Sequence, residues 1–407
     1  MKNLPASVID ELRGISGFDA VAFADAHNLA PVTSVRINPE KECGLFAGND
    51  KVLWCPSGRY LNERPVFTLD PFYHAGAYYV QEASSMFLDQ ILRQYLGGRS
   101  GLRVLDLCAA PGGKSTLIAS MLDKDSLLIS NDVIRSRATI LEENMTRWGY
   151  MNTWVTSNDP RDLGRLSGYF DVIVVDAPCS GSGLWRKDAA ALNEWSEANV
   201  QRCGERQQRI LADIWPALKP GGLLVYATCS YSPAEDEHIL DWLASSYPVR
   251  SLTIDVQSSW KIVTTTSPVK KMTGYRFFPG ITKGEGLYIA AVEKEGQPGD
   301  FQYPRFRSQH STKAMQQGGY LLQDQQVSCI QAGKDDFSVI MPDHEKDLHY
   351  LQQKVYLRKT GLNLGTPSGK DWLPGHDVAL SINAASDIPF VDVSKEQALW
   401  FLKREDM

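Results

Sequence analysis

From about residue 101 to residue 230 the chain alternates short apolar runs with stretches of helical periodicity. The runs typical of strands are LRVLDL, SLLISND, NTWVTSN, FDVIVVDAP and GLLVYATCS, and the helical stretches are KSTLIASML, ATILEENMTRWG and EANVQRCGERQQRILADIWPAL. Strict alternation of strand and helix indicates a parallel, doubly wound sheet, which binds ligands at the carboxyl ends of its strands. We therefore predict an α/β fold, and we expect GEGLYIAAVEK, residues 284–294, to form a terminal strand of the sheet.

A chain of 407 residues is long for one domain, so further units are expected around this core. Residues 1–99 combine a helical start with the strand-like SVRINP, which predicts an N-terminal α+β extension. The core is expected at residues 100–296, followed by a polar linker without periodicity at 297–313. Residues 314–407 contain DFSVIMP, KVYLRKTGLNLG and DVALSI, short β-like pieces that predict a small β-rich domain.

The composition excludes several classes of protein. No apolar run is long enough to span a bilayer, and the start MKNLPASVIDELRG lacks the apolar core of a signal peptide, so we expect a cytoplasmic protein without a membrane partner. The seven cysteines are scattered without a C-x-x-C pair, which argues against a disulfide framework and predicts no metal site. We expect a monomer.

The formal net charge of −6 gives no global reason to expect nucleic-acid binding. Such a partner would need local basic patches. The candidates are RSR (135–137), RCGERQQR (202–209), KKMTGYR (270–276) and YLRKTG (356–361), although ordinary solvated helix faces and loops are the favoured interpretation of any single patch.

The segment VLDLCAAPGGKST, residues 104–116, has the pattern of a strand, a tight loop and a helix start. Its tail imitates a phosphate-binding P-loop, but Cys108 stands where that motif has its first glycine, and Pro111 lies inside the loop. Both features disfavour wrapping of a triphosphate.

Aspartates follow the strands in a regular way. Asp132 comes 26 residues after Asp106, at the end of the second strand, where a carboxylate can accept both hydroxyls of a ribose. Asp159 and Asp176 end the third and fourth strands, and Asp159 can meet an adenine amino group. Singly, each is explained as a turn or helix cap.

Together with backbone amides at a helix start, which suit a carboxylate, these aspartates predict a site for S-adenosylmethionine. Its predicted members are Cys108, Ala109, Ala110, Pro111, Gly112, Gly113, Lys114, Asp132, Asp159 and Asp176.

Two cysteines follow strands that we expect to be neighbours, Cys179 in DAPCSGSG and Cys229 in ATCSYSPAEDE. A disulfide or two inert buried thiols are the alternatives. A pair of thiols over one crevice suits methylation of a pyrimidine at carbon 5, because a thiolate that adds to carbon 6 makes carbon 5 nucleophilic. Asp176 could hold the edge of the ring, and Lys114 could lower a thiol pKa or contact the base.

The motifs DLCAAPGGKST, DAPCSGSG and ATCSYSPAEDE, in this order, closely resemble those of the Sun-type RNA cytosine-5 methyltransferases. The resemblance extends over about residues 15–294. It implies a Rossmann-like class I methyltransferase core, an N-terminal RNA-recognition extension, S-adenosylmethionine as cofactor and 5-methylcytosine in RNA as product. It also implies that Cys229 is the nucleophile and that Cys179 assists proton loss or product release.

The segment YLRKTGLNLGTPSGKDWLPGHDVALSI resembles the PUA-like tail of bacterial 16S ribosomal RNA methyltransferases, which implies 16S rRNA or the small ribosomal subunit as partner. The alternatives are a tRNA methyltransferase, a DNA methyltransferase that attacks with Cys179, and a non-catalytic RNA-binding assembly factor. Trp185, Arg186 and Lys187 are candidates for RNA contacts or ordinary surface residues. This stretch and Gly280 depart from the family pattern.

Overall fold

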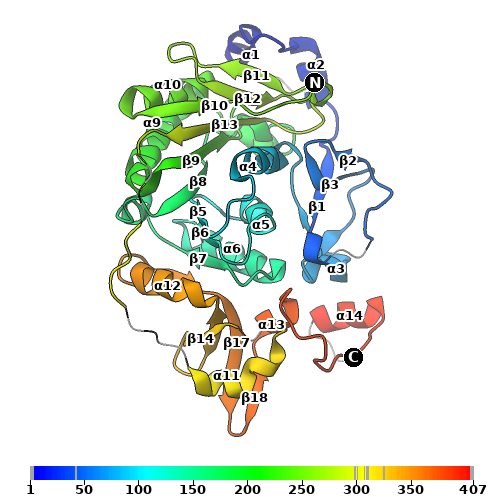
Figure 1. Cartoon of the computed structure of the whole chain (residues 1–407). Helices are drawn as coiled ribbons and strands as arrows, with labels where there is room; N and C mark the ends of the chain where they lie inside the picture. The colour runs from blue at the N-terminus through cyan, green and yellow to red at the C-terminus, as the bar shows by residue number, and fades with distance from the viewer. Residues whose placement is uncertain are drawn as a thin grey trace.

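The computed structural model describes residues 4–41, 44–297, 299, 301–306, 308, 311–323 and 326–403. These residues form a central ten-stranded sheet with the strand order β11-β12-β13-β9-β8-β5-β6-β7-β16, and β10 pairs with β13 (Figure 1). The strands are β5 (Arg103–Asp106), β6 (Leu127–Asn131), β7 (Thr153–Thr156), β8 (Phe170–Asp176), β9 (Leu218–Thr228), β10 (Val249–Leu252), β11 (Val263–Thr266), β12 (Thr273–Phe277), β13 (Leu287–Lys294) and β16 (Leu357–Lys359).

The five strands predicted between residues 101 and 230 are the parallel part of this sheet, as expected. The sixth, β13, is antiparallel to β9 and lies inside the sheet. Its prediction as a terminal strand was therefore wrong, because β12 and β11, which precede β13 in the chain, pair beyond it, and a single apolar run does not reveal that pairing.

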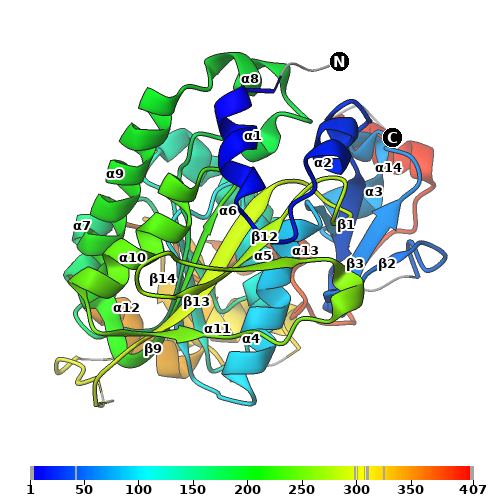
Figure 2. The same ribbon diagram turned by 90° about the horizontal axis from the view of Figure 1, so that it is seen from above.

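Two helical layers cover the sheet because neighbouring residues of each strand point to opposite faces. Val104 packs against α4 (Leu88–Leu96), α5 (Gly113–Ala119) and α6 (Arg135–Trp148), whereas Leu105 faces α7 (Pro160–Gly164), α9 (Glu197–Ile214) and α10 (Glu237–Ser246). Figure 2 shows α7, α9 and α10 on one side of the sheet and α4 and α5 on the other. Because β5, β6, β8 and β9 are parallel, their carboxyl ends lie along the same edge of the sheet.

The N-terminal region forms a second sheet of the order β2-β3-β1-β4, which confirms the strand predicted at SVRINP. Its elements are α1 (Ala6–Arg13), α2 (Ala20–His27), β1 (Thr33–Ile37), β2 (Lys51–Val52), β3 (Cys55–Leu61), α3 (Pro71–His74) and β4 (Tyr78–Val80). This region is joined to the core by Arg36, whose guanidinium lies over the Trp148 ring at 4.5 Å and donates to Thr116 Oγ1 at 2.5 Å.

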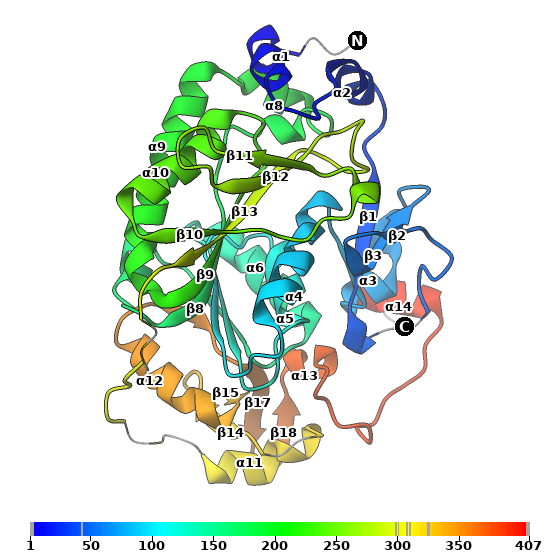
Figure 3. The ribbon, with the colours of Figure 1, turned by 45° about the horizontal axis from the view of Figure 1, so that its top comes forward.

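The C-terminal region has a third sheet of the order β14-β15-β17-β18, which lies together with α11 at one end of the molecule (Figure 3). Its elements are α11 (Thr312–Gly318), β14 (Ser328–Gln331), β15 (Phe337–Ile340), α12 (Glu345–Gln352), β17 (Leu362–Ser368), β18 (Asp371–Pro374), α13 (His376–Leu380) and α14 (Lys395–Leu402). Strand β16, between α12 and β17, instead pairs antiparallel with β7 and so extends the central sheet.

Two of the three C-terminal segments predicted as β-like pieces contain strands, and the third does not. DFSVIMP contains β15 and KVYLRKTGLNLG contains β16 and the start of β17, but DVALSI is not a strand. It overlaps helix α13, where Val378 is buried and Asp377 in the first turn accepts from the amide of Asn363 at 3.1 Å. Tertiary contact outweighs local β propensity there.

Part of the predicted linker, residues 298, 300, 307, 309 and 310, lies outside the described residues. Its described aromatic residues are packed, since Phe301 meets Tyr169 edge to face at 5.2 Å between ring centroids and Tyr303 donates to Asp347 at 2.5 Å. Among the helices of the described residues, none has both the length and the apolar character needed to cross a membrane.

Candidate active site

A cavity of about 570 Å³ opens at the carboxyl ends of the parallel strands. Such strand ends bring together residues that are far apart in the chain. Of the residues predicted for the site, those that line the cavity are Cys108, Ala110, Lys114, Asp132, Asp159, Asp176, Cys179 and Cys229. The other four predicted residues do not line the cavity but belong to the loop and the helix start that form part of its wall: Ala109, Pro111, Gly112 and Gly113.

The loop between β5 and α5 is held by main-chain contacts. Ala109 N–H donates to Asn131 O at 2.8 Å, and the side chain of Asn144 donates to Pro111 O at 2.6 Å. Gly112 has φ +118°, a conformation that favours glycine, and a Cβ there would approach the Leu141 side chain to 3.3 Å. The glycine therefore lets the loop turn tightly against α6.

Lys114 and Asp176 form an ion pair of 2.7 Å in the cavity wall. The Lys114 side chain is 8% exposed and that of Asp176 is 38% exposed, so the carboxylate is the more accessible member. Burial acts to lower the pKa of Lys114, but Asp176, Asp106 and Cys229 outweigh it and raise that pKa overall. Lys114 is therefore a fixed cation at neutral pH.

Asp106 lies behind this pair and is fully buried. Burial raises its pKa from the ordinary 3.8 to about 7, although a hydrogen bond of 2.7 Å from Ser115 Oγ and the nearby Lys114 act in the opposite direction. Its Oδ1 atom is buried without a hydrogen-bond partner.

Asp132 begins the turn after β6. Its Oδ1 accepts from Ile134 N–H at 2.9 Å, and its Oδ2 lies 3.3 Å from Arg137 Nη1 in a geometry too poor for a hydrogen bond. Asp159 caps α7 by accepting from Arg161 N–H at 3.0 Å. Asp132 therefore stabilises a turn and Asp159 caps a helix. Both residues nevertheless line the same cavity.

Sequence reasoning missed Asn131, which precedes Asp132 and lines the cavity. Its amide nitrogen donates to Leu107 O at 3.0 Å and to Asn158 O at 3.1 Å, and its oxygen accepts from Asn158 N–H at 2.9 Å. It therefore fixes three strand ends relative to one another. Its place in the strand-ending SND was the only available signal.

The two thiols lie where the spacing predicted. Strands β8 and β9 are parallel neighbours, and Cys179 Sγ lies 3.1 Å from Cys229 Sγ. All six cysteines in the described part of the chain are free. The contact with Cys229 and burial raise the pKa of Cys179 well above its ordinary value, so the Cys179 thiol holds its proton at neutral pH.

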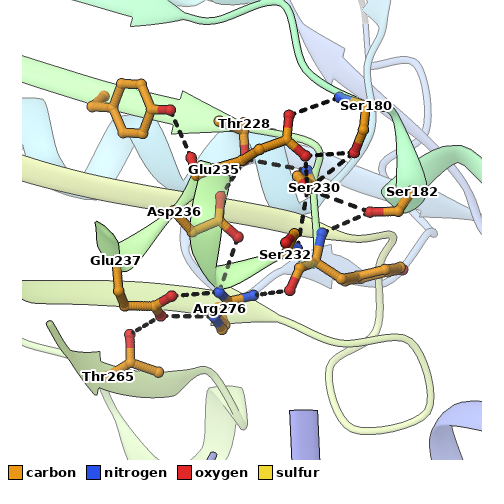
Figure 4. Close-up of polar contacts among 12 residues, drawn as sticks. Ser180, Ser182, Thr228, Ser230, Ser232, Glu235, Asp236, Glu237, Thr265 and Arg276 are labelled. Carbon is orange, nitrogen blue, oxygen red and sulfur yellow. Dashed lines mark hydrogen bonds and ion pairs between the residues drawn. The ribbon is translucent and has the colours of Figure 1, made fainter. Parts of the chain in front are cut away.

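A buried polar network, also missed, connects the loops that carry the two thiols (Figure 4). Glu235 accepts from Ser180 Oγ at 2.5 Å and from Ser230 Oγ at 2.6 Å. Arg276 Nη2 contacts Asp236 Oδ2 at 3.0 Å and Glu237 Oε2 at 2.5 Å. The cluster of acids in SPAEDE was visible in the sequence, but the residues that bind it come from distant segments: Ser180, Gln207, Thr265 and Arg276.

Two of the three candidates for RNA contacts or surface positions are buried structural residues instead. Trp185 is fully buried against Tyr231 and Trp195, and Arg186 forms a buried ion pair of 2.8 Å with Glu285. Only Lys187 of that stretch is exposed, and it lines the cavity.

Some cations of two basic patches are also paired within the fold. In KKMTGYR, Arg276 is buried in the network above. In YLRKTG, Arg358 pairs with Glu142 at 2.5 Å and Lys359 pairs with Asp377. A local sequence pattern cannot distinguish a solvated cation from one paired across the fold.

The described residues contain no group of His, Cys, Asp or Glu side chains arranged to hold a metal ion. The cavity is lined by cations and carboxylates in equal number: Lys114, Arg137, Lys187, Arg206 and Arg209 against Glu82, Asp132, Asp159, Asp176 and Glu285.

The fold is that of the Rossmann-like methyltransferases. A solved methyltransferase homolog protein from Pyrococcus horikoshii is 27% identical and superposes with a TM-score of 0.58 over 72% of this chain and 100% of its own. The fold is also shared with NSun6 from the same organism, solved with SFG, at 19% identity and a TM-score of 0.57 over 72% of this chain and 99% of that one.

The family is defined more closely by sequence. The model of the 16S rRNA methyltransferase RsmB/F family matches residues 94–293, and that of the N-terminal domain of 16S rRNA methyltransferase RsmF matches residues 4–83. The ribosomal RNA small subunit methyltransferase F of Erwinia tasmaniensis is 32% identical over 375 residues, which cover 86% of this chain and 76% of that relative. The chain therefore belongs to the RsmB/F family.

Its match to other members is shorter. The methyltransferase F of Pectobacterium carotovorum is 32% identical over 311 residues, covering 72% of this chain but 63% of the relative. The chain thus spans less than two thirds of the length of several relatives that it matches.

Proposed function

We propose that the protein transfers a methyl group from S-adenosylmethionine to carbon 5 of a cytosine in RNA. The observation that carries this proposal is the pair of thiols, 3.1 Å apart, in the same cavity as the aspartates of three strand ends. Few reactions need two free thiols beside a nucleoside site, and pyrimidine carbon 5 methylation is one of them.

The residues present fit the proposed cofactor. Asp132 and Asp159 offer carboxylates on one side of the cavity, beside the apolar side chains of Val133, Ile134 and Pro160, which could flank a flat base. The buried Asp132 Oδ2 has no hydrogen-bond partner, as expected of an atom that accepts a ribose hydroxyl. Bound there, S-adenosylmethionine supplies an electrophilic methyl group.

The two thiols take different roles in this proposal. Cys229 Sγ forms a bond to carbon 6 of the cytosine, which places the electron pair on carbon 5. The Lys114 ammonium stabilises the attacking thiolate electrostatically. Asp176, the more accessible partner of Lys114, holds the amino and imine edge of the ring.

After methylation the proton on carbon 5 must leave and the bond from Cys229 to carbon 6 must break. Cys179 is the group placed to assist this elimination, since its sulfur lies against that of Cys229. The Cys179 thiol, whose pKa is raised, gives its proton to the Cys229 sulfur as the bond to carbon 6 breaks, and the Cys179 sulfur accepts the proton from carbon 5.

The RNA is proposed to approach over the cationic part of the cavity rim. Lys187, Arg206 and Arg209 are exposed there and suit contacts with phosphates. We propose 16S rRNA or the small ribosomal subunit as the substrate, supported by the family and by the names of its members. We further propose a cytoplasmic monomer.

The domain boundaries predicted from sequence stand as part of this proposal, with residues 1–99 contacting RNA beside a core at 100–296 and a PUA-like unit at 314–407. The pairing of β16 with β7 supports a C-terminal unit fixed to the core.

The test is methyl transfer from labelled S-adenosylmethionine to 16S rRNA and to small subunits that lack this modification, followed by digestion of the RNA to nucleosides. We expect label in 5-methylcytidine. Label in another nucleoside, or transfer to tRNA or DNA in preference to rRNA, would refute the assignment.

A further inference from the structure

Each thiol of the pair is followed directly by a serine whose hydroxyl turns away from the cavity. Ser180 follows Cys179 and Ser230 follows Cys229, and both serines are buried. Their hydroxyls lie 3.4 Å apart and both donate to one oxygen atom, Oε2 of Glu235, at 2.5 and 2.6 Å (Figure 4). One carboxylate oxygen therefore holds the two cysteine-bearing loops together.

The other oxygen of Glu235 completes the arrangement. Oε1 accepts from Ser180 N–H at 2.8 Å and from the Gln207 side chain at 3.1 Å, and Gln207 also donates to Pro178 O at 3.2 Å. Cys179 is thus held on both sides. All four donors to the carboxylate are neutral, so Glu235 serves hydrogen bonding and not charge pairing.

Glu235 is itself fixed to the sheet, because its backbone oxygen accepts from Tyr226 Oη, on β9, at 2.7 Å. The bond from Ala177 N–H to Ala227 O, at 2.8 Å, lies at the end of the pairing between β8 and β9. Beyond it the chains continue as loops, and Gly181 has φ +76°. The loops leave the ladder just before the thiols, where precise spacing matters most.

We propose that Glu235 is a positioning residue that sets the separation of the Cys179 and Cys229 thiols. The proposal rests on the proposed function for its catalytic meaning, but the spacing of the sulfurs can be measured without catalysis. Ser180 and Ser230 transmit the effect, each to its own thiol, and Glu235 couples the two.

A glutamine at this position cannot reproduce the contacts. Both oxygens of Glu235 accept two donors each, whereas an amide has one oxygen. Its NH₂ group would face either two N–H donors or two serine hydroxyls that then lose their shared acceptor. Glu235→Gln therefore keeps the size of the side chain and removes half of its acceptors.

The experiment measures thiol spacing with phenylarsine oxide, a trivalent arsenical. The arsenic–oxygen bond is replaced by two arsenic–sulfur bonds and the two thiol protons leave as water, so tight binding needs two adjacent thiols and no oxidant. The wild type should bind one equivalent, and both Cys179→Ala and Cys229→Ala should abolish this tight binding.

Glu235→Gln should weaken the binding of the arsenical at least about tenfold, because the thiols are no longer pre-oriented. Asp347→Asn is the control for loss of a buried carboxylate elsewhere: Asp347 is also fully buried, accepts from the hydroxyls of Tyr169 and Tyr303 and pairs with Arg103 at 2.7 Å, and these partners do not line the cavity. It should lower thermal stability while leaving the affinity for the arsenical within about twofold of wild type.

Rates of adduct formation and release measure the effect of Glu235 on each cysteine-bearing loop separately. Ser230→Ala should slow formation of the Cys229 adduct, Ser180→Ala should slow its release, and Glu235→Gln should slow both, with methyl transfer reduced about a hundredfold and affinity for S-adenosylmethionine unchanged.

An affinity of Glu235→Gln for the arsenical equal to that of wild type overturns the positioning role, whatever the activity. So does a loss that Asp347→Asn shows equally, since that would reflect general destabilisation. If the arsenical results are as expected but wild type transfers no methyl group to RNA, the positioning role stands and the proposed function fails.

Discussion

At the scale of single residues, the site combines groups that motifs reveal with groups that they conceal. Cys179, Cys229 and Asp132 follow strands in the sequence, and strand ends of a parallel sheet converge by construction. Asn131 and Glu235 were missed because a buried polar residue acquires its role from partners in distant loops. Trp185 was misjudged because burial depends on the same distant contacts.

Asp106 provides a pH-dependent test at this scale. Its pKa is about 7 in the folded protein and 3.8 ordinarily, so between these values the folded state holds a proton that the unfolded state has lost. The contribution of Asp106 to stability therefore falls as pH rises from about 4 to about 7 and stays low above that.

Asp106→Asn should remove this dependence. Between pH 4.5 and pH 8 the free energy of unfolding of wild type should therefore fall, relative to that of the variant, by on the order of 3 kcal/mol. Urea unfolding of both proteins at the two pH values measures the difference. A difference that does not change with pH would show that Asp106 is ionised throughout.

At the scale of elements, periodicity predicted the parallel strands and the helices that cover them, because the buried face of an element determines where its apolar residues fall in the local sequence. It failed where pairing is set by distant segments. The internal position of β13 and the attachment of β16 to β7 are of this kind, as is the helix α13 at DVALSI.

Gly149, which ends α6, tests the contact between α6 and α13. It has φ +90°, and a Cβ there would lie 2.2 Å from Leu380 O. Gly149→Ala should cost about 1 kcal/mol for the backbone conformation and more for the clash, with loss of amide protection over residues 376–382 in hydrogen exchange.

The matched control is Gly97→Ala. Gly97 also ends a helix with a left-handed conformation, and its Cβ would meet no atom within 4 Å. Equal losses in the two variants would mean that the approach of α13 to α6 does not contribute to stability.

At the scale of the whole molecule, the three regions meet at one lysine. Lys41 Nζ donates to Ala75 O at 2.9 Å in the N-terminal region, to Arg147 O at 2.7 Å in α6 and to Leu380 O at 2.6 Å in α13. Three carbonyls from three regions thus share one ammonium. Nothing in the sequence around Lys41 distinguishes it from a surface lysine.

Lys41→Met should leave these carbonyls without their shared donor, at a cost of about 1–3 kcal/mol for each one that water cannot reach. We expect calorimetry to show the C-terminal region unfolding before the core. Lys283→Met is the control, because Lys283 pairs with Asp50 at the surface. A single transition at the wild-type temperature would exclude a coupling role for Lys41.

The central claim is that the two thiols, 3.1 Å apart beyond the ends of β8 and β9, have different roles: Cys229 attacks the cytosine and Cys179 assists its release. The most direct measurement incubates wild type, Cys179→Ala and Cys229→Ala with S-adenosylmethionine and 16S rRNA and resolves protein–RNA adducts on a denaturing gel. Cys179→Ala should accumulate a persistent adduct, because it forms but is not released, and Cys229→Ala should form none. An adduct that survives loss of Cys229 and disappears on loss of Cys179 would contradict the account.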